Sequence, residues 1–197
     1  GTMVQVAVTD LAAYFDDEIT AMPNLVTVGA GGTASTVAGI PFFAADNSIY
    51  THDVSGTDST AEQNAAYGIG AMDAITTGDF NTAVGWYALG ATTTGENNVA
   101  IGGGAGKSNT TGARNIAIGM DAYDASDTEN DNLAIGYNAM TTNTAGGTEN
   151  TAVGNYSLDA LTSGDGNTAV GMSALSANST GGYNTAVGRG ALIANTT

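Results

Sequence analysis

The chain has 197 residues and a formal net charge of −16, with 19 acidic residues against three basic ones, 29 glycines, two prolines and no cysteine. This charge argues against DNA and RNA as partners, because binding phosphate requires a basic surface. No apolar run is long enough to span a membrane, and no basic region followed by an apolar run indicates a signal peptide. We therefore expect no nucleic-acid partner and no membrane insertion.

The first third of the chain is not repetitive. Gly1-Thr2 before Met3 indicates a cloning remnant, and residues 3–62 predict a small α+β base or attachment segment. Alternating valines predict a strand, an amphipathic stripe predicts a helix, and a proline ends that helix. In chain order we expect a strand at 4–8, a helix from about residue 10 to Pro23, a strand at 25–28, a connector at 29–36 and strand-like pieces near 37–43 and 47–54.

A nine-residue phrase repeats through residues 63–197. It is clearest at Asn81-Thr82-Ala83-Val84-Gly85-Trp86-Tyr87-Ala88-Leu89. A fixed period of this size indicates stacked structural units rather than one globular core. The asparagine recurs every 17 residues, with one step of 18, at Asn64, Asn81, Asn98, Asn115, Asn132, Asn150, Asn167 and Asn184.

The phrase has nearly constant columns when its asparagine is counted as position 0. Position 2 is always alanine, as at Ala83, and position 4 is always glycine, as at Gly85. Position 3 is aliphatic in seven copies, as at Val84, and position 7 is alanine in seven, as at Ala88. Position 8 is usually large and apolar, as at Leu89, although Gly106 breaks that column.

These columns predict a parallel β-solenoid. Seventeen residues are too few for two helices and a turn, whereas β-branched residues beside an obligatory glycine indicate a short strand followed by a bend. We expect each unit to form one coil with two short strands and two bends. About eight coils stacked at the strand spacing of about 4.8 Å would make a rod roughly 38 Å long. The recurring asparagine predicts a ladder of side-chain amides at a bend.

The two faces of each strand predict association between chains. Neighbouring strand residues point in opposite directions, so Ala83 and Val84 lie on opposite faces, and both faces are apolar or small. One face can line the interior of the coil, and the other then needs a partner, which small alanines would allow to approach closely. One unit buries enough apolar surface for about 5–6 kcal/mol, against a conformational entropy cost on the order of 20 kcal/mol. We therefore expect several chains to associate.

Nothing in the sequence indicates catalysis. Gly29-Ala30-Gly31-Gly32 follows a predicted strand, but no helix signal, lysine or hydroxyl residue follows at the spacing of a phosphate-binding loop, so a linker is favoured. His52 is the only histidine, and no nucleophile motif accompanies it. We expect no enzymatic activity.

One unit contains a cluster of acidic residues. Clustered carboxylates can hold Ca²⁺. The spacing matches neither an EF-hand loop nor the glycine-rich nonapeptide of calcium-binding β-rolls, so a solvated acidic loop is favoured over a metal site. We expect no cofactor, with Ca²⁺ as the alternative. The residues are Asp121, Asp124, Asp127, Glu129 and Asp131.

Positions 5 and 6 vary most within the phrase and include several aromatic residues. Exposed aromatic rings beside asparagine would suit a sugar-binding patch, and equally they can cover the bend or pack between chains. The candidates are Trp86, Tyr87, Tyr137, Asn155 and Tyr156. A threonine column at position 1 is similar to the flat faces of ice-binding solenoids, but ice binding is not favoured because Val99, Ile116 and Leu133 interrupt the column.

The phrase Asn-Thr-Ala-Val-Gly-x-x-Ala-Leu resembles the repeat of YadA-like head domains in trimeric autotransporter adhesins. Those heads are left-handed parallel β-rolls with three chains around one axis. The 17-residue form, with Thr-Thr-Gly between phrases, looks more like a variant in bacteriophage tail fibres and related virion proteins. The resemblance covers roughly residues 64–197, and it implies a homotrimer.

The resemblance implies a trimeric fibre of a virus particle, on the virion surface, that contacts a host glycan or protein. The segment 3–62 would then attach the fibre to other virion proteins. Two alternatives stay open. One is a bacterial adhesin head that acts outside the cell, and the other is a structural spacer or capsid decoration protein without a ligand.

Overall fold

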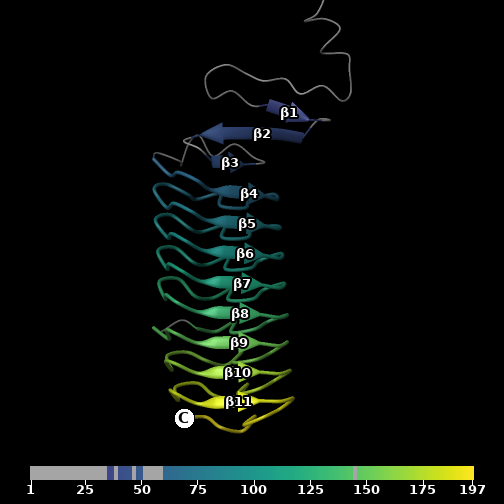
Figure 1. Ribbon diagram of the computed structural model, residues 1–197, viewed down its shortest axis with the longest axis vertical. Helices are drawn as coiled ribbons and strands as arrows, with labels where there is room; N and C mark the ends of the chain where they lie inside the picture. The colour runs from purple at the N-terminus through teal and green to yellow at the C-terminus, as the bar shows by residue number, and fades with distance from the viewer. Residues whose placement is uncertain (1–34, 38–39, 46–47, 51–59, 144–145) are drawn as a thin grey trace, which may run out of the picture.

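The computed structural model describes residues 35–37, 40–45, 48–50, 60–143 and 146–197. Their strands form one 11-stranded sheet in which neighbours in sequence are neighbours in space. Figure 1 shows the strands stacked in chain order along a rod. The strands are β1 (Ser35–Val37), β2 (Ile40–Ala45), β3 (Ser48–Tyr50), β4 (Ala65–Tyr67), β5 (Thr82–Val84), β6 (Val99–Ile101), β7 (Ile116–Ile118), β8 (Leu133–Ile135), β9 (Thr151–Val153), β10 (Thr168–Val170) and β11 (Thr185–Val187).

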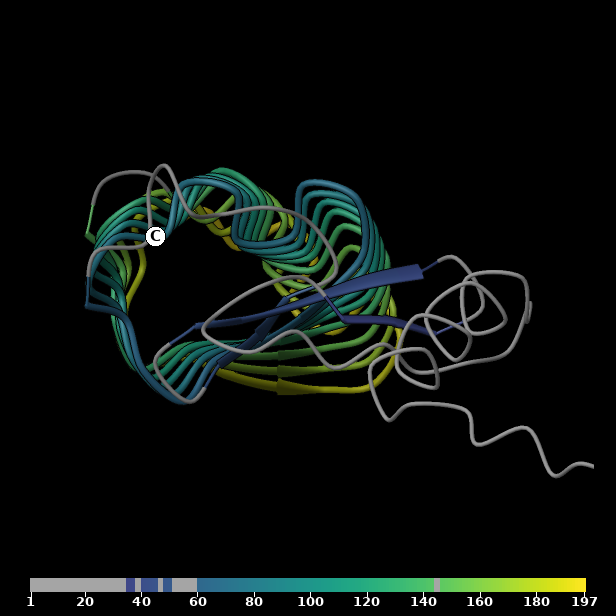
Figure 2. The same cartoon turned by 90° about the horizontal axis from the view of Figure 1, so that it is seen from above.

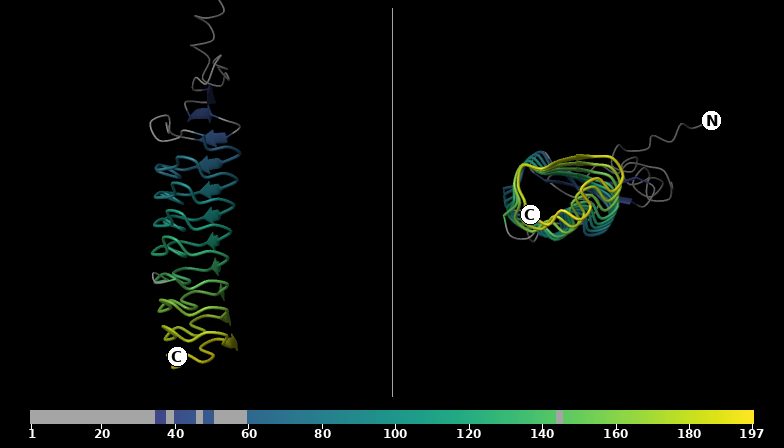
Figure 3. Two further views of the ribbon diagram at one scale, coloured as in Figure 1. Left: turned by 90° about the vertical axis from the view of Figure 1, so that its left-hand side faces the viewer. Right: turned by 90° about the horizontal axis from the view of Figure 1, so that it is seen from below.

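The predicted parallel β-solenoid is confirmed. From β4 to β11 each strand pairs in parallel with the next, and residues of the same repeat position lie side by side, as Ala83 does with Ala100 and Ala100 with Ala117. Seen along the axis, the coils superimpose (Figure 2). Seen from the side, the strands lie on one side of the rod (Figure 3). The fixed period therefore sets the register of the whole stack.

The two strand faces differ from our expectation. The alanines of position 2 point into the coil, where Ala83, Ala100 and Ala134 are completely buried. The aliphatic residues of position 3 point outward, and Val84 keeps 39% of its surface exposed. The suggestion that the alanine face meets a partner is therefore wrong. Larger side chains from the opposite wall fill the interior, which leaves room for only a methyl group on the strand.

The expectation of two strands per coil is also wrong. In residues 60–143 and 146–197 each coil has one three-residue strand, and turns and bends form its other walls. Two residues of these turns, at positions 6 and 8, take left-handed φ values, as Tyr87 (50°) and Leu89 (49°) do. This conformation curls the chain away from an extended strand. Backbone hydrogen bonds still connect coils there, as from Leu89 N to Ala105 O at 3.0 Å.

The core is a single column of stacked side chains. Alanines of positions 2 and 7 surround the large residues of position 8, and together they make one buried cluster. Leu89, Tyr123 and Met140 lie in this column at 2% exposure or less. Their left-handed backbone is unfavourable for residues other than glycine. Burial of these large side chains offsets that cost in each coil.

The glycine of position 4 permits the bend after each strand. Gly85 has a φ of 137°, a conformation that residues with a Cβ rarely adopt. A Cβ at Gly85 would also overlap the carbonyl of Gly102 in the next coil. Both the conformation and the close stacking of coils therefore require glycine.

A ladder of asparagine side chains closes each coil, as the sequence predicted. The Asn98 side chain donates from Nδ2 to the carbonyl of Gly112, at the far end of its own coil, over 2.8 Å. Its Oδ1 accepts the backbone N–H of Asn115, in the next coil, over 2.9 Å. The same link from one asparagine to the next joins every consecutive pair from Asn64 to Asn184. Each asparagine from Asn64 to Asn167 thus holds its own coil shut and connects it to the next coil.

Three strands before the solenoid extend its sheet beyond the first coil. β3 pairs in parallel with β4, and β2 lies antiparallel to both β1 and β3. β2 and β3 confirm the strand-like pieces expected near 37–43 and 47–54. β1 corrects the expected connector at 29–36, because Ser35 and Thr36 already pair with β2. The strands expected at 4–8 and 25–28, the helix ending at Pro23, the Gly29–Gly32 segment and His52 lie outside the described residues.

In the part of the chain that the structure describes, no helix has the length and apolar character needed to span a membrane.

Candidate interaction surface

The outward strand face is a continuous, uncharged feature of the described solenoid. We call it the strand-face stripe and define it as the residues at positions 1 and 3 of β4 to β11. It contains only alanine, threonine, tyrosine and aliphatic residues, and no charge. Its members are Ala65, Tyr67, Thr82, Val84, Val99, Ile101, Ile116, Ile118, Leu133, Ile135, Thr151, Val153, Thr168, Val170, Thr185 and Val187.

Several side chains of the stripe remain exposed although adjacent coils flank them with the same repeat positions, and others, such as those of β8 and β9, are half-buried. Ile101 is 41% exposed, Ile116 is 38% exposed and Val170 is 37% exposed. Eight strands at the usual spacing, each about 10 Å long, present on the order of 400 Å² of nearly flat surface. The largest apolar patch on a typical monomeric protein has a similar area, about 300–600 Å², and is often functional. The stripe is therefore a surface suited to burial against another molecule.

The aromatic candidates lie at the corner that follows the strand, and they form two groups. Trp86 and Tyr87 contact each other edge to face, with ring centroids 4.9 Å apart. Trp86 is 57% exposed, whereas Tyr87 packs its ring over Gly70 of the preceding coil. This group presents one indole to solvent with a ring supporting it.

The second group spans two coils. Tyr137 and Tyr156 contact edge to face with centroids 5.3 Å apart, and each is 39% exposed. Asn155 accepts the backbone N–H of Tyr137 at its Oδ1 over 2.9 Å, which holds the corner in place. Burial of the ring raises the pKa of Tyr156. Three coils, or about 14 Å, separate this group from the first, so the five residues form two small surfaces rather than one.

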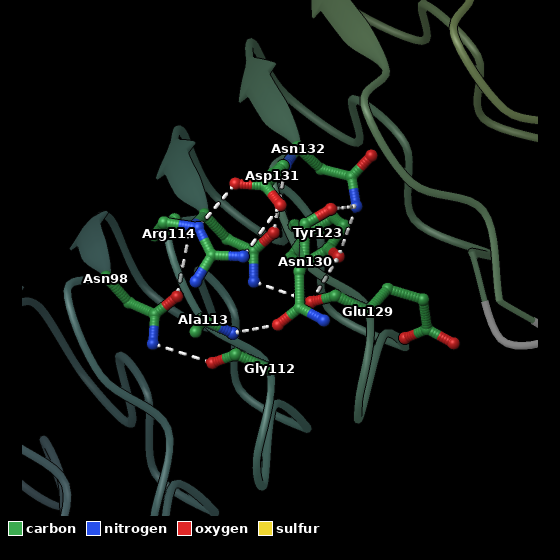
Figure 4. Close-up of polar contacts among 10 residues, drawn as sticks. Asn98, Gly112, Ala113, Arg114, Tyr123, Glu129, Asn130, Asp131 and Asn132 are labelled. Carbon is green, nitrogen blue, oxygen red and sulfur yellow. Dashed lines mark hydrogen bonds and ion pairs between the residues drawn. The ribbon is translucent and has the colours of Figure 1, made fainter.

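The acidic residues predicted as a Ca²⁺ alternative do not converge. Asp131 accepts two hydrogen bonds from the Arg114 guanidinium in the preceding coil, at 2.6 and 2.8 Å, as Figure 4 shows. These bonds lower the pKa of the Asp131 carboxyl. The pair is exposed and contributes little to stability. Both oxygens of the Asp131 carboxylate nevertheless accept hydrogen bonds from Arg114, so the carboxylate faces Arg114.

Glu129 points in a different direction and is buried. Its carboxylate accepts backbone N–H groups from Asp127 and Thr128, and from Gly146 of the next coil, at 3.0 to 3.1 Å. Glu129 stands where most coils have glycine, and the coil that it contacts is the 18-residue one. The carboxylate therefore accepts hydrogen bonds from backbone N–H groups where its own coil meets the irregular one.

Tyr123 supports the same region from the core. Its hydroxyl accepts Nδ2 of Asn132 at 2.8 Å and donates to the carbonyl of Glu129 at 3.3 Å (Figure 4). Burial raises the pKa of the Tyr123 hydroxyl well above its ordinary value. No feature of the sequence indicates this role, because Tyr123 occupies position 8, where most coils have a large apolar residue.

The other three acids lie on the outer turns. Asp121 lies over Gly104 of the preceding coil, and Asp127 is exposed. Partial burial raises the pKa of the Asp124 carboxyl, against the opposing effect of Lys107. Across the residues that the structure describes, no three acidic or histidine side chains are placed to hold one metal ion. Ca²⁺ binding stays the untested alternative to a solvated acidic loop.

Sequence reasoning missed part of the surface. Met120 and Met172 occupy position 5, as Trp86 does, and are 56% and 39% exposed. They extend the apolar character of the stripe around the corner. The repeat itself carries this signal, because position 5 is aliphatic, aromatic or methionine in five of the eight coils.

Comparison of the chain with protein-family models, with curated proteins and with solved structures gives no match.

Proposed function

We propose that the chain is a non-enzymatic, homotrimeric fibre protein of a virus particle that contacts the host surface. The observation that carries this proposal is the strand-face stripe, an uncharged apolar face that runs the length of a rod. An exposed surface of this kind marks an interaction site.

The period of the stripe indicates what covers it. Its rungs repeat with the strand spacing of about 4.8 Å, and a partner that matches every rung must have the same spacing. Another copy of the chain has that spacing. Three rods around a common axis would each turn the stripe inward and leave the turns, which hold the acidic residues, facing solvent. Self-repulsion from the charge of −16 per chain is smallest in that arrangement, because the interface itself is uncharged.

The aromatic groups support contact with a host glycan or protein over the spacer alternative. A spacer needs no exposed indole, whereas Trp86 is 57% exposed beside a second ring. Aromatic rings next to hydrogen-bonding groups suit sugar faces. The bacterial adhesin head stays the second candidate, because it has the same architecture and would use the same surface.

A printed panel of surface glycans tests host contact. The labelled protein is expected to bind a subset of the panel. A Trp86→Ala/Tyr87→Ala variant is expected to lose that binding while keeping the oligomeric state and melting temperature of the wild type. Tyr137→Ala/Tyr156→Ala provides the matched variant for the second group. Equal binding by the wild type and both variants would remove the aromatic corner from the proposal.

A further inference from the structure

Three consecutive coils near the middle of the rod have a more apolar outward face than the coils beside them. In β6, β7 and β8 both outward residues are aliphatic, whereas β5, β9, β10 and β11 each present a threonine and a valine. These strands lie next to one another in Figure 1. We call their six outward residues the aliphatic zone: Val99, Ile101, Ile116, Ile118, Leu133 and Ile135.

Strand register makes the aliphatic zone continuous. Ile116 lies between Val99 and Leu133, and Ile118 lies between Ile101 and Ile135, in direct parallel pairing. Ile101 and Ile116 remain about two-fifths exposed in spite of these neighbours. The zone is therefore a block of aliphatic surface with threonine and valine rungs at both ends.

Copies of a repetitive rod can pack in more than one axial register, and the aliphatic zone can select one of them. A face made only of threonine and valine rungs looks the same after a shift of one coil, or about 4.8 Å. Two copies that pack through such a face can associate in several registers of similar energy, as flat repetitive strands do. Specificity for one register then needs an element that is favourable in one alignment and unfavourable in the others.

We propose that the aliphatic zone fixes the axial register of the copies in the assembly. This inference rests on the homotrimer proposed above. In register, each zone is buried against the zones of the other copies. A slip of one coil places a terminal aliphatic rung against threonine hydroxyls, which loses apolar burial and leaves hydroxyl groups without hydrogen-bond partners.

A uniform variant tests the inference. It carries Val99→Thr, Ile101→Val, Ile116→Thr, Ile118→Val, Leu133→Thr and Ile135→Val, so that every rung from β5 to β11 becomes threonine and valine. Each new residue already occupies the same position in neighbouring coils, so we expect the solenoid to fold, as circular dichroism would verify. The association constant is expected to fall by more than about a hundredfold, because six apolar side chains per copy shrink or become polar.

Register is measured by cross-linking. The chain has no cysteine, so Thr168→Cys and Thr185→Cys, on the outward faces of adjacent coils, give unique probes. Chains with either probe are co-expressed and oxidised, because a disulfide requires Cβ atoms about 3.5–4.5 Å apart and therefore distinguishes coils that are about 4.8 Å apart. In the wild-type background we expect only links between identical sites. In the uniform background we expect links between Cys at position 168 and Cys at position 185 as well.

A shifted variant gives a positive test. Val99→Thr, Ile101→Val, Thr151→Ile and Val153→Ile move the zone by one coil, from β6–β8 to β7–β9. When the shifted variant is mixed with wild type, the cysteine at 168 of the wild-type chain is expected to link to the cysteine at 185 of the shifted chain. The reverse pair, wild-type 185 with shifted 168, is the internal control and should give no link.

The outcomes separate this inference from the proposed function. A wild-type trimer whose uniform and shifted variants keep wild-type register and affinity would overturn the role of the zone and leave the homotrimer standing. A wild-type chain that stays monomeric would overturn both.

Discussion

The backbone N–H of Asn115 donates to Oδ1 of Asn98 over 2.9 Å, while Nδ2 of Asn98 donates to the carbonyl of Gly112 over 2.8 Å. One buried amide thus connects two coils and closes one of them. Because both its donor and its acceptor are used, no other side chain of similar size can replace it. The asparagine column is therefore a requirement of the stack rather than a preference for polar residues at a bend.

Replacing Asn98 with alanine should destabilise the solenoid by about 2–5 kcal/mol. The change leaves the buried N–H of Asn115 and the buried carbonyl of Gly112 without these partners. Thermal or urea unfolding measures the effect. Thr111→Ala, at an exposed position of the same coil, is the control and should have little effect. Equal stability of the two variants would show that the amide ladder is dispensable.

Replacing Gly85 with alanine should cost about 3 kcal/mol or more. Its φ of 137° is unfavourable for alanine, and the added Cβ would overlap the carbonyl of Gly102. Gly103→Ala is the matched control, because a Cβ there meets no atom within 4 Å. A melting temperature unchanged in the first variant would contradict the close stacking of glycines between coils.

Mild acid should stabilise the protein. Burial raises the pKa of Asp124 and Asp159 above the ordinary 3.8, so the folded state holds these protons more tightly than the unfolded state does. Stability from these groups is therefore greatest below pH 3.8 and declines as pH rises through the raised folded pKa. Lower net charge adds to the effect by reducing self-repulsion.

Asp124→Asn isolates that contribution. The variant should melt at a higher temperature than wild type at pH 7, and its melting temperature should vary less between pH 4 and pH 7. Asp127→Asn, an exposed residue of the same turn, controls for the removal of one negative charge. Identical pH profiles for the wild type and Asp124→Asn would refute the assignment.

Salt should raise the melting temperature of the assembly, and Ca²⁺ should act no differently from NaCl at equal ionic strength. Screening over a Debye length of about 8–10 Å relieves repulsion among acidic chains. Asp131 is engaged by Arg114, and Glu129 by backbone donors, so the predicted cluster offers no shared cage. A Ca²⁺-specific rise that disappears in Asp121→Asn/Asp124→Asn would establish a metal site.

The sequence predicted the architecture because the features that determine it are local and periodic. The period fixed the parallel register, the constant glycine marked the bend, and the asparagine column marked the ladder. It could not decide whether Ala83 or Val84 points inward. That choice depends on how much space Leu89 and its equivalents leave across the coil, and the spacing of residues in one strand does not contain this information.

The sequence also could not predict that each coil lacks a second strand, or that Glu129 binds backbone N–H groups. Left-handed residues such as Tyr87 and Leu89 curl the chain after the strand, although neither residue type favours that conformation by itself. Glu129 looked like one member of an acidic cluster. Its backbone partners come from the irregular coil of 18 residues, whose path no repeat pattern describes.

Sedimentation equilibrium of the wild-type chain, beside Ile101→Asp and Ala100→Asp, tests the central claim most directly. The wild type should sediment at about 58 kDa, three times the chain mass of 19.4 kDa. Ile101→Asp should be folded but monomeric, because it places a charge on the outward stripe, whereas Ala100→Asp should be unfolded, because it places one in the core. A folded wild-type monomer near 19.4 kDa would contradict the account.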